Sequence, residues 1–125
     1  MAVRKHSRQR DALLNALADR TDHPSAETLY QELREVEPKI SLGTVYRNLA
    51  LLVENGEILK LTGGDDKSHY DGNIKPHDHF WCRSCGKLTD IFHEDFEMTF
   101  KNFNGRIESH QTLYTGICDE CIKAE

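Results

Sequence analysis

The amino-acid sequence predicts an α+β protein with a winged helix-turn-helix unit followed by a small α/β unit. Three observations predict this class. Three segments with helical periodicity come first, and a short hairpin follows them. Strand-like segments rich in Thr, Ile, Tyr and Phe dominate the remainder. Two Cys-x2-Cys pairs fall in this second part, and 125 residues are enough for two small domains.

The first two helices are predicted from apolar residues at helical spacing. Residues 8–20 carry leucines that repeat with the helical period. In the next segment Ser25 is suited to be an N-cap, acidic residues lie in or near the first turns, and Pro38 is expected to end the helix. The buried stripe of this second helix is expected to contain Leu29, Tyr30, Leu33 and Val36.

A third helix and a hairpin complete the first unit. Ser41 is the expected N-cap, and Asn55-Gly56 is a typical C-terminal stop. Segment 57–72 then has the pattern of two short strands joined by a Gly-Gly-Asp-Asp turn. Three helices followed by a hairpin is the order of a winged helix-turn-helix. The inward-facing residues of the third helix are expected to be Val45, Leu49, Leu52 and Val53.

The second unit has a different pattern. Segments 77–82, 87–93 and 106–118 are strand-like, and segment 94–103 is expected to be a short amphipathic helix. A Gly/Asn/Pro stretch, typical of a linker, marks the change. We therefore expect one domain at residues 1–72 and a second at residues 73–125.

Charge is distributed unevenly over the two halves of the chain, whose formal net charge is −5. Residues 1–60 hold nine of the 16 basic and nine of the 21 acidic residues, so residues 61–125 carry the whole excess. The first half could meet phosphate on one face, whereas the second would be repelled by it. No apolar run is long enough to span a bilayer, and the N-terminus lacks the pattern of a signal peptide, so the cytoplasm is expected.

The four cysteines are spaced as zinc ligands. Cys82 and Cys85 form one pair, Cys118 and Cys121 form another, and 32 residues separate the pairs. Two such pairs complete a tetrahedral shell of four sulfurs, which suits a structural Zn2+. Disulfides, idle thiols or a thioredoxin-like redox pair are the alternatives. Without a secretion signal disulfides are not expected, and a redox pair needs no matching second pair.

Histidines and carboxylates form a second group of candidate ligands. His77 and His79 point the same way on an extended segment. Imidazole and carboxylate ligands fit Fe2+, Mn2+ or Zn2+. The sequence thus predicts two kinds of site, one of sulfur and one of nitrogen and oxygen, although these histidines could also be ordinary surface residues. Further members of the group are His23, His69, Asp71 and Asp90.

Four motifs together resemble the Fur superfamily of bacterial metal-dependent repressors. They are "HPSAETLYQEL", "ISLGTVYRNLALLVENGEILKL", "HDHFWCRSCGKLTD" and "TLYTGICDEC", and the match runs from about residue 7 to residue 121. The resemblance implies an N-terminal winged-helix DNA-binding domain and a C-terminal dimerisation domain with zinc on its two CxxC motifs. It also implies a regulatory metal site with ligands from both domains, at His23, Asp71, His77, His79 and Asp90.

Aspartate at both variable ligand positions, Asp71 and Asp90, is typical of the peroxide-sensing PerR branch of this superfamily. In that branch Fe2+ reacts with hydrogen peroxide and a ligand histidine is oxidised. The resemblance implies that the oxidised residue here is His23 or His77.

The sequence departs from the family pattern in two places. Most relatives carry an extra helix, which could contact DNA, before the segment that matches residues 7–14. Here almost nothing precedes that segment. Pro76 stands where a further histidine often contributes to a third metal site. That additional site is a weaker expectation, and a solvated face is its alternative; its candidate ligands are Asp78, Glu97 and His110.

The resemblance therefore implies a homodimeric transcriptional repressor that binds palindromic double-stranded operator DNA, with structural Zn2+ and regulatory Fe2+ or Mn2+. The third helix would be the recognition helix in the major groove. Tyr46 could pack on a thymine methyl group or, alternatively, be buried beneath the helix. The candidate DNA-binding residues are Lys5, Ser41, Thr44, Tyr46, Arg47 and Asn48.

Three other functions fit parts of the sequence. An iron, manganese or zinc uptake regulator would use the same ligands to measure metal concentration. A non-haem iron enzyme could use two histidines and a carboxylate. A zinc-ribbon interaction module would use the cysteines alone. The last two leave the helix-turn-helix order unexplained, so we expect a regulator and not an enzyme.

Overall fold

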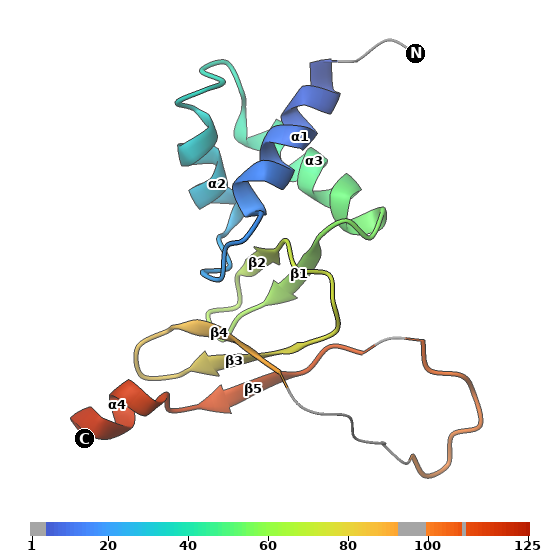
Figure 1. Cartoon of the computed structure of the whole chain (residues 1–125), viewed down its shortest axis with the longest axis vertical. Helices are drawn as coiled ribbons and strands as arrows, with labels where there is room; N and C mark the ends of the chain where they lie inside the picture. The colour runs from blue at the N-terminus through green and yellow to red at the C-terminus, as the bar shows by residue number, and fades with distance from the viewer. Residues whose placement is uncertain (1–4, 93–99, 109) are drawn as a thin grey trace. The chain divides into compact units, whose positions relative to one another are not determined.

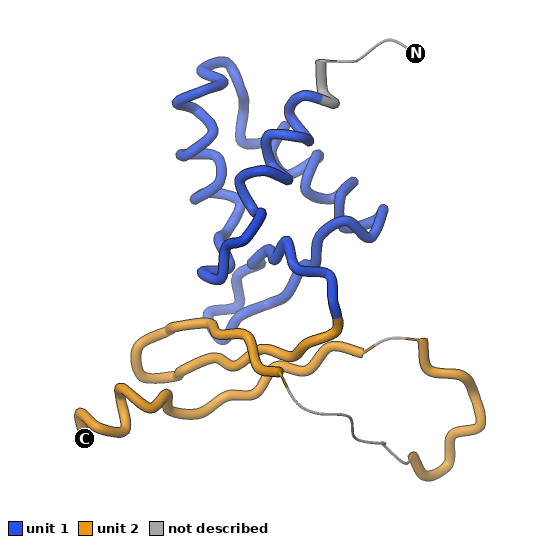
Figure 2. Tube along the Cα trace, in the orientation of Figure 1, with its two compact units in different colours: residues 1–75 blue, residues 76–125 orange. Residues whose placement is uncertain are grey.

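A computed structural model describes residues 5–92, 100–108 and 110–125, with side chains from residue 8 onward. The chain divides into two compact units, Met1–Lys75 and Pro76–Glu125 (Figure 2). This division lies in the same Gly/Asn/Pro stretch as the expected boundary. Each unit has its own secondary structure and is described by itself.

Three helices form the main body of the first unit, in the order that the sequence predicts (Figure 1). They are α1 (Lys5–Leu17), α2 (Ala26–Leu33) and α3 (Leu42–Glu54). Among the described residues, none of the helices combines the length and apolar character needed to cross a bilayer. The buried core that the helices and the hairpin share consists of Leu13, Leu17, Ala26, Leu29, Leu33, Ile40, Val45, Leu49, Leu52, Ile58 and Tyr70.

Both predicted N-caps are confirmed. The Thr28 N–H donates to Ser25 Oγ at 3.2 Å, and the Thr44 N–H donates to Ser41 Oγ at 3.1 Å. Helix α3 ends as predicted, because Asn55 is its C-cap and Gly56 adopts a φ of 74°, a conformation that favours glycine.

The predicted end of α2 is wrong. The helix stops at Leu33 with Arg34 as its C-cap, well before Pro38. Val36 therefore lies in the following turn, off the face that carries Leu29 and Leu33. It is 72% exposed and is not part of the buried stripe.

The predicted hairpin is an antiparallel pair of strands, β1 (Leu59–Thr62) and β2 (Ser68–Asp71). Its register places Leu59 opposite Asp71 and Thr62 opposite Ser68. Asp65 stabilises the turn by accepting the Lys67 N–H at 3.1 Å. With the three helices, this hairpin completes the predicted winged helix-turn-helix.

A three-stranded sheet forms the centre of the second unit (Figure 1). The middle strand, β3 (Asp78–Cys82), pairs antiparallel with β4 (Leu88–Ile91) and parallel with β5 (Leu113–Gly116). A short helix, α4 (Asp119–Ala124), follows β5. Helices and sheets together confirm the predicted α+β class.

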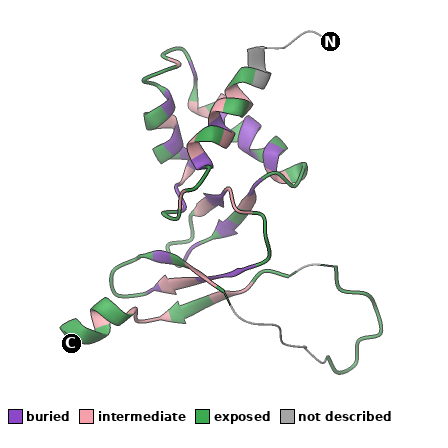
Figure 3. Cartoon of the chain, in the orientation of Figure 1, coloured by how far each residue is buried: buried purple, intermediate pink, exposed green. Residues whose placement is uncertain are grey.

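Three details of the second unit differ from the sequence prediction. The strand expected at 106–118 is a strand only at Leu113–Gly116. Within the helix expected at 94–103, residues 94–99 lie outside the described residues and 100–103 are not helical. Helix α4 was not expected. This helix has no buried residue, and segment 100–108 is also exposed (Figure 3).

Candidate functional site

The four cysteine sulfurs of the second unit gather in one cluster. The Sγ atoms of Cys82 and Cys121 are 3.8 Å apart, and those of Cys85 and Cys118 are 3.9 Å apart. All four lie within 4.8 Å of one another. A regular tetrahedron with Zn–S bonds of about 2.3 Å has S–S edges of about 3.8 Å. The cluster therefore fits a tetrahedral Zn2+ with four thiolate ligands.

Strand pairing brings the two distant cysteine pairs together. Cys82 ends β3 and lies opposite Gly116 of the parallel strand β5, after which Cys118 begins α4 as its N-cap. The turn after Cys82 is closed by the Gly86 N–H, which donates to the Cys82 carbonyl at 2.8 Å. Gly86 has a φ of 76°, so glycine suits this position.

The thiols of the cluster differ in acidity. The backbone N–H groups of Cys118 and Cys85 donate to Cys82 Sγ, each at 3.4 Å, and lower the pKa of Cys82 to about 6. The hydrogen bond with the Cys118 sulfur raises the pKa of Cys121 to about 12. One thiolate forms readily and the next is disfavoured beside it. A bound dication would remove this conflict, because it stabilises all four thiolates.

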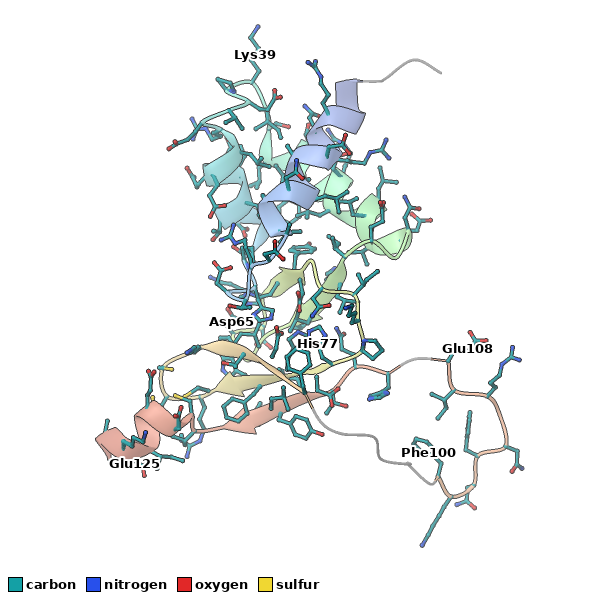
Figure 4. The ribbon with its side chains drawn as sticks, in the orientation of Figure 1. Lys39, Asp65, His77, Phe100, Glu108 and Glu125 are labelled. Carbon is teal, nitrogen blue, oxygen red and sulfur yellow. The ribbon has the colours of Figure 1, made fainter. Side chains whose placement is uncertain are left out.

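Two histidines and one aspartate converge elsewhere in the second unit. His77 Nε2 lies 3.1 Å and His79 Nε2 lies 3.3 Å from Asp90 Oδ1 (His77 is labelled in Figure 4). The register places His79 directly opposite Asp90 on neighbouring strands. Both histidines are buried, and the His77 ring stacks on Phe92 with centroids 5.4 Å apart. The second unit thus supplies three of the five predicted regulatory ligands in one place.

The first unit brings the other two together. His23 Nε2 lies 3.4 Å from Asp71 Oδ2, and both side chains are buried. Asp71 ends β2, and its Oδ1 accepts the Asn73 N–H at 2.9 Å. His23 has a φ of 52°, a conformation that a residue with a side chain adopts uncommonly. Each unit therefore carries its own imidazole–carboxylate set, and both sets have donors that suit Fe2+ or Mn2+.

The additional metal site is described only in part. Asp78 is buried, and His110 Nε2 lies 3.7 Å from its Oδ1. Glu97, the third predicted ligand, lies outside the described residues. Two of the three residues are therefore close enough to share an ion.

Helix α3 presents several of the predicted DNA-binding side chains on its surface. Tyr46 is 41% exposed, so it is not buried beneath the helix. Its hydroxyl donates to Glu27 Oε1 of α2 at 2.6 Å. Arg47 is also exposed and donates through Nη2 to Thr44 Oγ1 at 3.1 Å.

The other predicted DNA-binding residues differ in their surroundings. Ser41 is exposed at the start of α3, where its hydroxyl caps the helix. Asn48 is 4% exposed, and its Nδ2 donates to the Thr44 carbonyl at 3.0 Å, so its amide is engaged within the helix. Lys5 is the first residue of α1, but its side chain is outside the described part of the chain.

Two residues near these groups form contacts that the sequence does not predict: Glu27, which has no expected role, and His69, which is expected only as a member of the histidine and carboxylate group. Glu27 contacts Tyr46, and His69 Nδ1 lies 2.8 Å from the carbonyl oxygen of His23. These contacts join residues 19 and 46 positions apart, so no local sequence pattern indicates them. For Glu27 the available signal is its place in the first turn after the N-cap Ser25. For His69 it is its place in the same strand as Asp71.

Comparison with known proteins gives relatives along almost the whole chain. The model of the ferric uptake regulator family matches residues 2–114. The peroxide operon regulator of Bacillus subtilis is 34% identical over 121 residues, which cover 94% of this chain and 83% of that protein. The likeness to the peroxide-sensing branch, predicted from the two aspartates, is thus confirmed.

Solved structures agree with this relationship. The ferric uptake regulator Fur of Helicobacter pylori, described with three functional metal-binding sites, has a TM-score of 0.77 at 26% identity, covering 93% of this chain and 81% of that one. The peroxide stress regulator of Campylobacter jejuni has a TM-score of 0.64 at 36% identity, covering 70% of this chain and 64% of that one. On these matches, the chain belongs to the ferric uptake regulator family.

Proposed function

We propose that the chain is a metal-dependent, DNA-binding transcriptional repressor that senses hydrogen peroxide. The observation that carries the proposal is the convergence of His77, His79 and Asp90 beside a separate cluster of four cysteines. The thiolate set suits a structural zinc ion, and the imidazole–carboxylate set suits a more reactive metal. Two of the named relatives are a peroxide operon regulator and a peroxide stress regulator, which supports the same function here.

The zinc proposal assigns Cys82, Cys85, Cys118 and Cys121 a structural role. Four protein ligands leave no open coordination position, so such a site stabilises the fold and does no chemistry. It would hold the start of α4 against the end of β3 in a unit with few buried side chains. We assign residues 73–125 as the dimerisation and metal-binding domain and residues 1–72 as the DNA-binding domain.

The regulatory proposal assigns five ligands to one Fe2+ or Mn2+ ion. His23 and Asp71 come from the proposed DNA-binding domain, and His77, His79 and Asp90 come from the other. A metal with ligands from both domains would fix their relative orientation. In a homodimer this orientation sets the spacing of two recognition helices, which must match a palindromic operator. A coupling of about 1–3 kcal/mol is enough to change operator occupancy strongly.

Bound Fe2+ would supply the centre that reduces peroxide. The protein would supply the groups beside it, and the resemblance to the peroxide-sensing branch points to the imidazole rings of His23 and His77 as the groups that are oxidised. One oxygen atom of H2O2 is added to a ring carbon and the other leaves as water, so the ring loses two electrons that peroxide gains. An oxidised ring is a poorer ligand, which releases the fixed orientation.

In the proposed DNA interface, the start of helix α3 and the start of α1 contact the operator. Tyr46 and Arg47 are exposed on α3, where they could reach base edges. Ser41, Thr44 and Lys5 would add contacts to the DNA backbone. A protein that acts on operator DNA works in the cytoplasm. A regulator also accounts for the winged helix-turn-helix, for which an iron enzyme has no use.

Mass spectrometry of metal-loaded protein after brief peroxide treatment tests this function. With Fe2+ we expect a 16-dalton addition on the peptide that contains His23 or His77, together with loss of operator binding. With Mn2+ we expect operator binding without the addition, since Mn2+ does not readily do this chemistry.

Four results would contradict the proposal. Equal modification with both metals, or oxidation confined to the cysteines, would indicate a thiol sensor. With Fe2+, operator binding that is retained without any modification would indicate an iron, manganese or zinc uptake regulator, in which the same five residues measure metal concentration. Failure to bind any DNA duplex, together with iron-dependent catalytic consumption of oxygen, would indicate an enzyme.

Asp78 and His110, with Glu97, remain our proposed additional metal site. The 3.7 Å separation of His110 Nε2 and Asp78 Oδ1 supports it. A second Mn2+ or Zn2+ equivalent that is lost in His110→Ala, with the first equivalent unchanged, is the expected result.

A further inference from the structure

The turn that contains His23 is bound to strand β2 at consecutive residues. His69 Nδ1 lies 2.8 Å from the His23 carbonyl oxygen, and the Tyr70 N–H donates to the Pro24 carbonyl at 3.0 Å. The next residue of the strand, Asp71, lies beside the His23 ring. Residues 69–71 therefore determine where His23 lies, through its backbone and its side chain.

His69 holds the backbone of His23 at a point of strain. His23 adopts a φ of 52°, which is an unfavourable conformation for a residue with a Cβ. A carbonyl oxygen only accepts hydrogen bonds, so His69 Nδ1 carries a proton and donates it. This bond fixes the peptide plane that follows the strained residue.

The opposite edge of the His69 ring is also fixed. Its Nε2 lies 3.2 and 3.1 Å from the two carboxylate oxygens of Asp65, at the tip of the β1–β2 hairpin (Asp65 is labelled in Figure 4). Asp65 is itself held by the Lys67 N–H. The ring fits here because of Gly63, where a Cβ would lie 3.0 Å from two ring atoms. The imidazole thus spans the gap between the hairpin tip and the His23 turn.

We infer that His69 is a positioning residue that holds His23 in place as a metal ligand. His69 and Asp71 are two positions apart on β2, so both side chains point to the same face of the hairpin. His69 fixes the backbone of His23, and Asp71 lies beside the His23 ring. This inference rests on the proposed regulatory site, to which it adds a residue that binds no metal itself.

Mn2+ titration of zinc-loaded protein tests the inference with three variants. His69→Leu removes the donor, and we expect regulatory Mn2+ affinity to fall about 10- to 100-fold, as when groups that orient a ligand are lost. His69→Asn keeps an N–H near the position of Nδ1 and should recover most of that affinity. His23→Ala removes the ligand itself and sets the size of the full effect. Zinc content should be unchanged in all three.

The outcomes separate the inference from the proposed function. Normal Mn2+ affinity in His69→Leu with weak binding in His23→Ala overturns the inference alone. Normal affinity in both variants overturns the assignment of His23 to the regulatory site. Should His69→Leu fold poorly, Asp65→Asn loosens only the far edge of the ring and should still weaken Mn2+ binding. If His69→Leu lowers the melting temperature as well as the Mn2+ affinity, and His69→Asn restores neither, the role of His69 is merely structural and the inference is overturned.

Discussion

Tyr46 and Glu27 form a hydrogen bond that depends on the protonation state of both side chains. The Tyr46 hydroxyl lowers the pKa of Glu27, and Glu27 as acceptor raises the pKa of Tyr46. The bond is therefore strongest when the carboxyl is ionised and the phenol is protonated. Both groups are largely exposed, so its effect on stability is screened by solvent.

We predict that Glu27→Gln changes how stability depends on pH. The depressed pKa of Glu27 gives stability that is present above the unfolded value near 4.5 and is lost as pH falls through the folded pKa. The raised pKa of Tyr46 gives stability that is present below about 10 and is lost as pH rises. The difference in melting temperature between wild type and variant should thus be largest near neutral pH. Tyr46→Phe should show the same profile, and a difference independent of pH would contradict this explanation.

Substitutions at the exposed residues of α3 test the DNA interface. Tyr46→Ala or Arg47→Ala should weaken operator binding by about 1–3 kcal/mol if the side chain contacts a base. Neither residue is in the buried core, so zinc content and folding should be unchanged. Arg34→Ala is the control for Arg47→Ala, because it also removes one positive charge from an exposed residue, at the end of α2. It should weaken operator binding less in the same titration. Unfolding of the first domain in Tyr46→Ala would contradict its surface position.

At the level of elements, the two capped helices of the first unit make a matched pair. Ser25 and Ser41 accept backbone N–H groups at nearly the same distance. Removing either hydroxyl leaves a donor at the helix N-terminus without its acceptor.

We predict that Ser25→Ala and Ser41→Ala each lower the free energy of unfolding by about 1 kcal/mol, measured in denaturant. Only Ser41 begins the proposed recognition helix. Ser41→Ala should therefore weaken operator binding at temperatures where both variants remain folded, while Ser25→Ala should not. Equal operator affinity in the two variants would remove Ser41 from the interface.

Helix α3 could be predicted from the sequence because several local signals agree on it. Its cap, its apolar spacing and its terminal glycine are all short-range properties. The end of α2 was mispredicted because Val36 continues the apolar spacing after the chain has left the helix. Helix α4 was missed because six residues without a buried face carry almost no periodic signal.

Ligand types could be predicted for the same reason, and contacts between distant residues could not. The spacing of Cys82 and Cys85 indicates one ion because two close thiolates point to the same place. The burial of Asn48 depends on how the helices pack, and its residue type suggested a surface contact. The bond between His69 and the backbone of His23 joins residues 46 positions apart. Such a contact arises only when the hairpin and the turn have folded.

For the whole molecule, we predict that zinc is required for a folded dimer. Cys118→Ser should give zinc-poor protein that is monomeric or unfolded, because losing a structural ligand removes folding free energy. Arg83→Ala, a change at an exposed residue between two ligands that keeps all four sulfurs, is the control. Metal analysis and size-exclusion chromatography provide the measurement. A stable zinc-free dimer of Cys118→Ser would refute the prediction.

The parallel pairing of β3 with β5 has a consequence for the order in which the chain folds. The first unit is built from three helices and a hairpin that follow one another along the chain, so it can form early. The second unit must first close a long loop, since Cys82 and Cys118 are 36 positions apart. A zinc ion bound to both cysteine pairs offsets that entropy. Newly made protein would therefore have its helical unit in place before its second unit is complete, and completion of that unit would depend on zinc.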